Sequence, residues 1–158
     1  MDADTDPIFS EILMTIYFYN TRDAHGGFSN FSRHGFTLKD VWWPTSEHYF
    51  QAQKFAGTEH EDAIRSAPTP RAAADMGRDR RRPLRADWEH MKDDVMRAAV
   101  RAKFRAHADL RAELLATGDA VLVEHAPGDY YWGCGADGSG KNMLGQILME
   151  VRAELAHD

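Results

Sequence analysis

Helix start signals run through the middle of this chain, and they restrict its possible folds more than any other feature. Thr58 with Glu61 three residues later has the pattern of a capping box, and Thr69 precedes a proline, Pro70, in the favoured first helical position. Gly118 is a helix stop signal. These and similar signals predict helices over residues 45–55, from 58, from 69, and over 87–104, 110–117 and 143–155.

Segments with the β-branched and aromatic composition of strands are short. They are Met14–Tyr19, Phe36–Trp43 and Ala120–Glu124. These segments do not alternate regularly with the helices, so a doubly wound sheet is not expected. The sequence predicts a helix-rich α+β fold, a single domain with a small β-sheet surrounded by about six helices. We expect this domain to span residues 13–158, after a poorly ordered acidic segment over residues 1–12.

Length and composition indicate one ordinary globular domain. The chain has 158 residues, of which 43% are hydrophobic. Its single cysteine, Cys134, excludes an internal disulfide and favours a reducing compartment. No apolar run is long enough for a membrane helix, and the N-terminus is acidic, unlike a secretory signal. We therefore expect a cytoplasmic protein without membrane contact, whose oligomeric state the sequence leaves open.

The net charge of −6 is unevenly distributed. Residues 71–105 contain eleven Lys and Arg against six Asp and Glu, a local +5, which leaves −11 for the rest of the chain. The acidic remainder disfavours a general nucleic-acid coat protein, which needs a broad basic face. The basic block, with Arg78 and Arg85, is either a solvated surface or a grip for one or two phosphates.

The segment from Trp43 to Phe55 has a polar row in helical spacing. At 100° per residue, Glu47, Gln51 and Lys54 fall within about a 60° arc. Phe50 and Phe55 flank this row. The row is either one wall of a site or an exposed Glu–Lys ladder, which would contribute only a few tenths of a kcal/mol.

A glycine-rich region over residues 128–140 holds a second candidate. Asp129 and the aromatic residues that follow it form either part of a binding site or an irregular turn. Residues 135–142 resemble a P-loop, but Asn142 stands where Ser or Thr would bind magnesium, and no strand directly precedes them. A nucleotide triphosphatase is therefore disfavoured, whereas a phosphate cradle at the start of the last helix is still expected. The scattered histidines and Cys134 show no metal-ligand spacing, so we expect no metal.

Several segments together resemble the YbiA-like family, also called NADAR, and within it the bacterial YbiA type. The similar segments, in family order, are residues 28–31, 43–55, 76–78, 85–88, 102–104, 122–124, 129–133 and 140–145. They cover roughly residues 15–155. The resemblance implies an N-glycosidase that breaks the C–N glycosidic bond of phosphoribosylamino-pyrimidine intermediates of riboflavin biosynthesis and so limits metabolite damage. Other members are linked to removal of ADP-ribose from guanine in nucleic acid, which gives an alternative partner.

The resemblance also implies site residues. Glu47, Trp88 and Asp129 are carried over as site residues, and the less certain positions are Lys54, Asn30, Trp132, Gly133 and Asn142. Chemically, Glu47 and Asp129 suit an acid–base pair, and Lys54 could instead form a Schiff base with an opened ribosylamine. Trp88 and Trp132 suit base stacking. The candidates for the 5′-phosphate are Arg78, Arg85, Lys141 and Asn142.

This chemistry needs a small phosphorylated ribosyl-amine substrate and no cofactor. A non-catalytic ADP-ribose or nucleotide binding module is a rival of another class. Such a module would need the aromatic and phosphate contacts but not Glu47 and Asp129 together, so the presence of both favours an enzyme.

Overall fold

The computed structural model describes residues 14–158, so the acidic segment over residues 1–12 lies outside the described residues. Six α-helices and four short strands make up this part of the chain. The strands are β1 (Thr15–Phe18), β2 (Phe36–Leu38), β3 (Val41–Trp43) and β4 (Val121–Glu124). The helices are α1 (Ser46–Gln53), α2 (Glu59–Arg65), α3 (Pro70–Arg78), α4 (Trp88–Ala106), α5 (Ala108–Ala116) and α6 (Met143–Ala156), with a 3₁₀ turn over Gly26–Phe28. The predicted helix-rich α+β class is confirmed.

The strands form two separate two-stranded sheets within residues 14–158. β1 pairs in parallel with β4, with Thr15 opposite Val121 and Phe18 opposite Glu124. The extended stretch predicted over Phe36–Trp43 is instead the antiparallel hairpin of β2 and β3. It turns at Lys39 and Asp40, whose φ angles of 55° and 63° give the two-residue turn that matches strand twist.

Three of the predicted helix starts are capped as the sequence indicates. Thr45, Thr58 and Thr69 each accept a hydrogen bond from a backbone N–H of the first turn of α1, α2 and α3. Asp87 precedes α4 without capping it, because its carboxylate pairs with Arg85 at 2.6 Å. The helix predicted from residue 87 therefore begins within one residue of the expected start, although Asp87 does not cap it.

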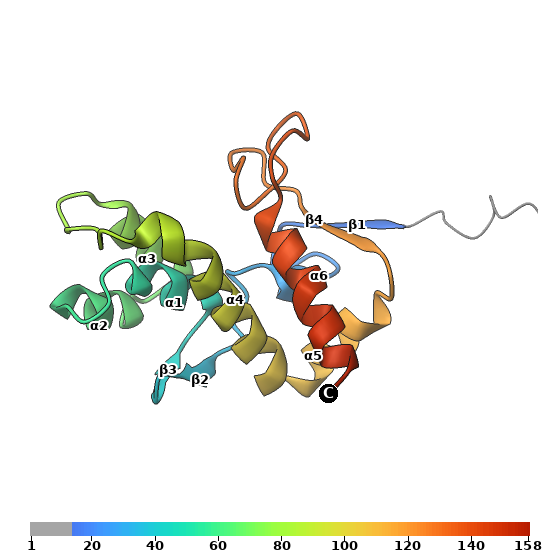
Figure 1. Cartoon of the computed structure of the whole chain (residues 1–158), viewed down its shortest axis with the longest axis horizontal. Coiled ribbons are helices and arrows are strands. Elements are labelled where there is room, and N and C mark those ends of the chain that lie inside the picture. The colour runs from blue at the N-terminus through green and yellow to red at the C-terminus, as the bar shows by residue number, and fades with distance from the viewer. Residues whose placement is uncertain (1–13) are drawn as a thin grey trace, which may run out of the picture.

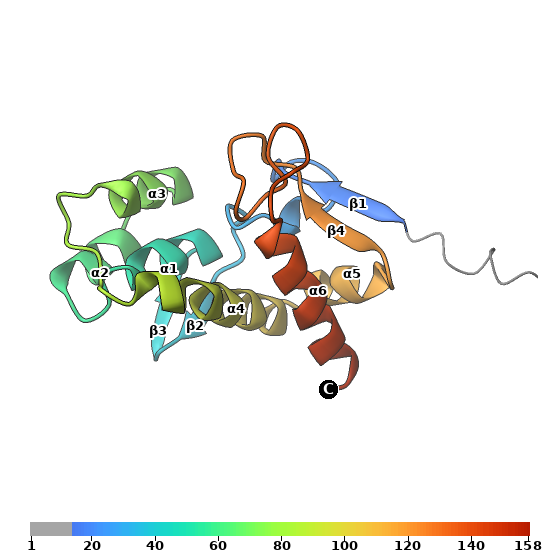
Figure 2. The same cartoon turned by 45° about the horizontal axis from the view of Figure 1, so that its top comes forward.

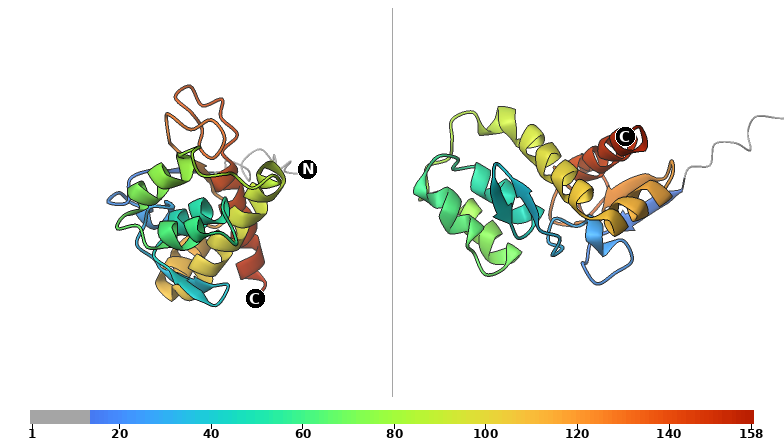
Figure 3. Two further views of the ribbon diagram at one scale, coloured as in Figure 1. Left: turned by 90° about the vertical axis from the view of Figure 1, so that its left-hand side faces the viewer. Right: turned by 90° about the horizontal axis from the view of Figure 1, so that it is seen from below.

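The helices pack around two long elements, α4 and α6. α4 runs between a group formed by α1, α2 and α3 and a group formed by β1, β4, α5 and α6 (Figure 1 and Figure 2). The loop from β4 to α6 rises beyond the N-terminal end of α6, and the view from below shows how α4 separates the two groups (Figure 3). The largest fully buried side chains include Trp43, Phe18, Phe28 and Phe104. No helix in residues 14–158 is long and apolar enough to cross a membrane.

Candidate active site

One cleft of about 910 Å³ lies between α1, α3, the first turns of α4 and the segment that follows β4. Its size is near the upper end of small-molecule sites. Among the sequence-predicted site residues, seven line it: Asn30, Glu47, Lys54, Arg78, Trp88, Asp129 and Trp132. These residues are spread over about a hundred positions of the sequence, and the fold brings them to one cleft.

The floor of the cleft is α1, a helix buried on every side. All its residues from Ser46 to Gln53 are buried, so the alternative of an exposed Glu–Lys ladder does not hold. Glu47, Gln51 and Lys54 line the cleft as their spacing indicates, and Gln51 Nε2 donates to Glu47 Oε1 at 2.8 Å. Burial raises the pKa of Glu47, while the Gln51 amide, Arg78 and Lys54 act against that rise.

Gly77 on α3 allows α3 to approach the polar side chains of α1. A Cβ at Gly77 would lie 2.8 Å from Gln51 Cβ, and the Gln51 amide would have to move. The carbonyl of Gly77 also accepts a hydrogen bond from Lys54 Nζ at 3.5 Å. The small residue in the Met76–Arg78 segment thus supports both Gln51 and Lys54.

Lys54 is 7% exposed and lies against aromatic rings. Its Nζ is 5.7 Å from the ring centroid of Phe50 and 5.9 Å from that of Trp88. Burial, with Arg80 and Arg78 nearby, lowers the pKa of Lys54 to about 8, so a fraction of the amine is neutral near pH 7. The sequence expectation of a flank by Phe55 is wrong: Phe55 is 1% exposed and packs in the core against His60 instead.

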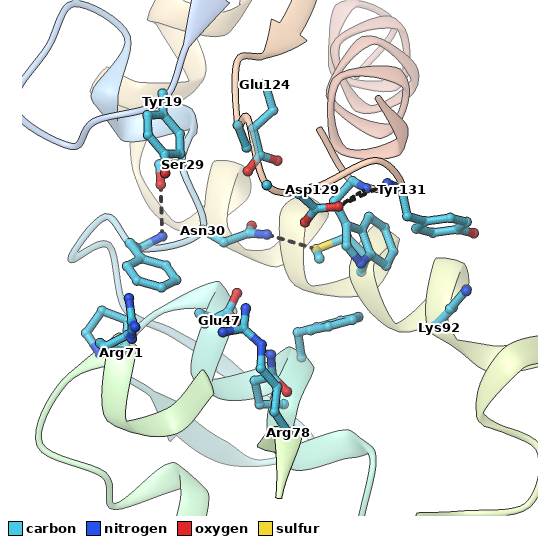
Figure 4. A pocket seen from close by; sticks show the side chains of 18 of the residues that line it. Tyr19, Ser29, Asn30, Glu47, Arg71, Arg78, Lys92, Glu124, Asp129 and Tyr131 are labelled. Atoms are coloured by element: carbon cyan, nitrogen blue, oxygen red, sulfur yellow. Dashed lines mark hydrogen bonds between the residues drawn. The ribbon is translucent and has the colours of Figure 1, made fainter. Parts of the chain in front are cut away.

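Asp129 and Glu124 come from the other side of the cleft. Asp129 Oδ1 accepts hydrogen bonds from the backbone N–H groups of Tyr131 at 3.0 Å and Trp132 at 2.8 Å, which orients the carboxylate. Figure 4 shows Glu124 and Asp129 on one side of the pocket, Glu47 and Arg78 on the other, and Asn30 between them. Glu47, Glu124 and Asp129 therefore face a common space.

Glu124 was not selected from the sequence as a site residue. It ends β4 and lines the cleft, and its Oε2 is buried without a hydrogen-bond partner among the described residues. The pKa of Glu124 is raised to about 8, mainly by burial and further by the neighbouring Asp129 and Glu47. The sequence feature that could have identified Glu124 is an acidic residue at the carboxyl end of a predicted strand, where a loop begins.

Asn30 connects the start of α1 with α4. Its Oδ1 accepts from Ser46 Oγ at 2.9 Å, its backbone carbonyl accepts from Glu47 N at 3.2 Å, and its Nδ2 approaches Met96 Sδ at 3.4 Å. Lys103 Nζ donates to the preceding carbonyl, that of Ser29, at 2.9 Å. Asn30 thus fixes the start of α1, and with it the position of Glu47.

An aromatic wall, defined by Phe50, Trp88 and Trp132, lines the same cleft. Ring centroids lie 5.2 Å apart for Phe50 and Trp88, and 5.1 Å apart for Phe50 and Trp132. Tilted and edge-to-face contacts of this kind hold the rings rigidly. The wall offers flat apolar surface for a heterocyclic base beside the carboxyl groups.

Positive side chains surround the cleft, but not all of the predicted ones. Arg78 lines it together with Arg33, Arg71 and Lys92, which the sequence reasoning did not single out. Arg71 and Lys92 lie in the basic block, whose positive balance was the available signal. Arg85 is outside the lining, because its guanidinium pairs with Asp87 and donates to the Gln53 carbonyl at 3.4 Å.

The start of α6 does not form the expected phosphate cradle. The backbone N–H groups of Lys141, Asn142, Met143 and Leu144 donate to the carbonyls of Tyr130, Gly133, Tyr131 and Trp132 at 2.9–3.1 Å. These groups are therefore not available to an anion. The side chains of Lys141 and Asn142 are also outside the cleft lining, so their expected role in phosphate binding does not fit their placement.

Asn142 and Gly133 support the cleft from behind. Asn142 Oδ1 accepts from Glu124 N and its Nδ2 donates to Leu122 O, each at 2.9 Å, so the amide pairs with the edge of β4 as a neighbouring strand would. A Cβ at Gly133 would lie 2.9 Å from Ala126 Cβ. Both residues shape the loop that carries Asp129 rather than face a ligand. Within residues 14–158, no three His, Cys, Asp or Glu side chains are placed to share a metal ion.

Known proteins are similar to this chain over most of its length. The model of the NADAR domain family matches residues 17–156. The N-glycosidase YbiA of Escherichia coli (strain K12) is 55% identical over 141 residues, which cover 89% of this chain and 88% of that protein. The NMR structure of E. coli YbiA is 54% identical to this chain and has a TM-score of 0.85. The match covers 91% of this chain and 86% of the YbiA chain. A riboflavin biosynthesis protein of Vibrio vulnificus (strain YJ016) is 43% identical over 140 residues, 89% of this chain but 38% of that longer protein.

Proposed function

Since the chain belongs to the NADAR domain family and is an N-glycosidase, we propose that it hydrolyses phosphoribosylamino-pyrimidine intermediates of riboflavin biosynthesis. The products are ribose 5-phosphate and the free aminopyrimidine. The observation that best supports this proposal is that Glu47 and Asp129 lie on opposite sides of one cleft, next to the aromatic wall. The name of the Vibrio relative supports the riboflavin context.

The cleft offers a separate group for each part of such a substrate. The pyrimidine packs on Trp88 and Trp132, and the 5′-phosphate is held by Arg78 with help from Arg71 or Arg33. In this arrangement the C1′ carbon lies between Glu47 and Asp129. One carboxylate stabilises the positive charge that develops at C1′, and the other activates water.

A second chemical route uses Lys54. Ribosylamines open to imines, and the Lys54 amine can exchange into the imine, release the aminopyrimidine and leave a lysine Schiff base for hydrolysis. The pKa of about 8 supplies neutral amine near physiological pH. Borohydride treatment with substrate present separates the routes: a reduced adduct on Lys54 supports this one, and its absence removes it.

The first experiment measures ribose 5-phosphate by mass spectrometry after incubation with freshly prepared substrate. Wild type should release it, and Glu47→Gln should reduce the rate by about 10²–10⁴-fold, the range for loss of an acid–base group. Glu59→Gln is the matched control, because Glu59 is exposed on α2, away from the cleft. No release by wild type would refute the proposed substrate.

The cleft volume also admits a larger ligand, which keeps ADP-ribosylated guanine as the second candidate substrate. The same assay on ADP-ribosylated guanine oligonucleotides decides between them. With a riboflavin intermediate as the substrate, the proposed role is repair of metabolite damage in the cytoplasm. ADP-ribosylated guanine as the substrate would not support this role. Failure on both substrates would favour a binding module, whose titration with ADP-ribose would then be the measurement.

A further inference from the structure

We propose that Glu124 is the general acid of this site and protonates the exocyclic nitrogen as its bond to C1′ breaks. This assignment rests on the proposed N-glycosidase function and adds a catalytic residue to it. The three carboxyl groups then have different roles: Glu124 gives the proton, whereas Glu47 and Asp129 act as carboxylates at C1′.

The backbone of Glu124 is held on both sides. Its N–H donates to Asn142 Oδ1 at 2.9 Å, and its carbonyl accepts from Cys134 N at 2.9 Å. On β1, the residue opposite is the buried Phe18. These contacts fix the end of β4, and Figure 4 shows the Glu124 side chain pointing from there into the pocket. A rigid strand end positions a proton donor more precisely than a free loop.

The surroundings of Glu124 favour its neutral form. The charged groups that act on it are Asp129, from the loop after β4, and Glu47, from α1, and both are acidic. β1 contributes the uncharged Phe18, and the residue just before α6 is the uncharged Asn142. With Oε2 buried and unpaired within residues 14–158, the carboxyl keeps its proton at neutral pH, in line with its pKa of about 8.

Burial and Asp129 also raise the pKa of Glu47, but its other neighbours act against that rise, and Glu124 has no such neighbours. The amide of Gln51 donates to Glu47 at 2.8 Å, and Arg78 and Lys54 add positive charge. Asp129 accepts two backbone N–H groups. Hydrogen-bond donors and cations stabilise the ionised form of a carboxyl group. Burial without a hydrogen-bond partner, between two other acidic groups, stabilises the protonated form. The difference in environment assigns the acid role to Glu124.

The proposed step is balanced. The proton passes from Glu124 to the exocyclic nitrogen, the C1′–N bonding pair leaves with that nitrogen, and the aminopyrimidine departs neutral. Water then forms the C1′–O bond and gives one proton to a carboxylate, either Asp129 or Glu47. Transfer of that proton through solvent restores neutral Glu124, and the sum is hydrolysis with no other reactant.

The test is Glu124→Gln, which keeps the shape of the side chain but has no transferable acid proton. Its kcat should fall by about 10²–10⁴-fold, with KM within a few-fold of wild type. In wild type, kcat should decline above about pH 8 as Glu124 loses its proton, and this alkaline limb should be absent from the residual rate of the variant. A limb that persists in the variant would come from Lys54, whose pKa is also about 8, and would count against Glu124. Glu124→Asp should keep the limb at a lower rate, and Glu59→Gln should match wild type.

A second measurement needs no active variant. In protein labelled with ¹³C at glutamate carboxyls, the resonance missing from Glu124→Gln should titrate near pH 8. Titration in the ordinary range near pH 4.5, or full activity of Glu124→Gln beside an active wild type, would overturn the assignment and leave the proposed function standing. A wild type that releases no ribose 5-phosphate would refute the proposed function first, and this assignment with it.

Discussion

Replacement of Asn142 separates a structural role from the phosphate-binding role that the sequence suggests. Asn142 has a left-handed backbone with φ of 53°, and its amide bonds both Glu124 N and Leu122 O. Asn142→Gly retains the freedom to adopt this backbone but removes the amide. Asn142→Ala removes the amide and also strains the backbone, because a left-handed conformation costs most L-residues about 1–2 kcal/mol.

The magnitude follows from the two hydrogen bonds. An unpaired buried donor or acceptor costs about 1–3 kcal/mol, and Leu122 is fully buried. Asn142 is only partly buried, so water can replace part of the lost hydrogen bonding. We therefore expect Asn142→Gly to lower the free energy of unfolding by about 2–4 kcal/mol, and Asn142→Ala to lower it by about 1–2 kcal/mol more. For a chain of this length, the glycine variant should melt roughly 4–16 °C lower than wild type.

Thermal unfolding followed by circular dichroism measures the stability of the three proteins, and the release assay gives KM for each. The expected order of Tm is wild type, Asn142→Gly, Asn142→Ala. At a temperature where each variant is folded, KM should change little, because the Asn142 side chain does not line the cleft. An unchanged Tm with a KM raised only for the phosphorylated substrate would refute this reasoning and restore the phosphate role.

Two further predictions use other contacts of the structure. Arg78→Ala should raise KM about 10-fold or more for the phosphorylated substrate only, whereas Arg85→Ala, outside the cleft, should leave this preference unchanged; equal losses with the dephosphorylated analogue would remove Arg78 from the phosphate site. Burial lowers the pKa of Lys103 to about 7, so between about pH 7 and 10.5 the unfolded chain holds a proton that the folded protein has released. The free energy of unfolding should therefore rise with pH across this window, and Lys103→Met should flatten the rise in urea titrations; equal slopes would contradict the buried-amine account.

Much of this protein follows from the sequence because the signals are local. Thr45, Thr58 and Thr69 cap helices in the structure because a capping hydroxyl needs only the next turn of its own chain. The row of Glu47, Gln51 and Lys54 follows from helical geometry alone. Six of the eight residues chosen by resemblance also line the cleft, because the sequence motifs of a family reflect its shared fold.

Only the tertiary structure decided what these residues face. Spacing could not show that α1 is buried on every side, that Phe55 turns into the core, or that the N–H groups at the start of α6 are taken by loop carbonyls. Nor could it show Glu124 between two acidic neighbours. Hydrogen-bond partners and desolvation depend on groups far apart in the chain, and burial sets the protonation of a carboxyl group. The sequence by itself therefore determined the helices and a candidate set of which seven of eleven residues line the cleft. Packing determined which of these residues hold a proton, carry a charge or only support the fold.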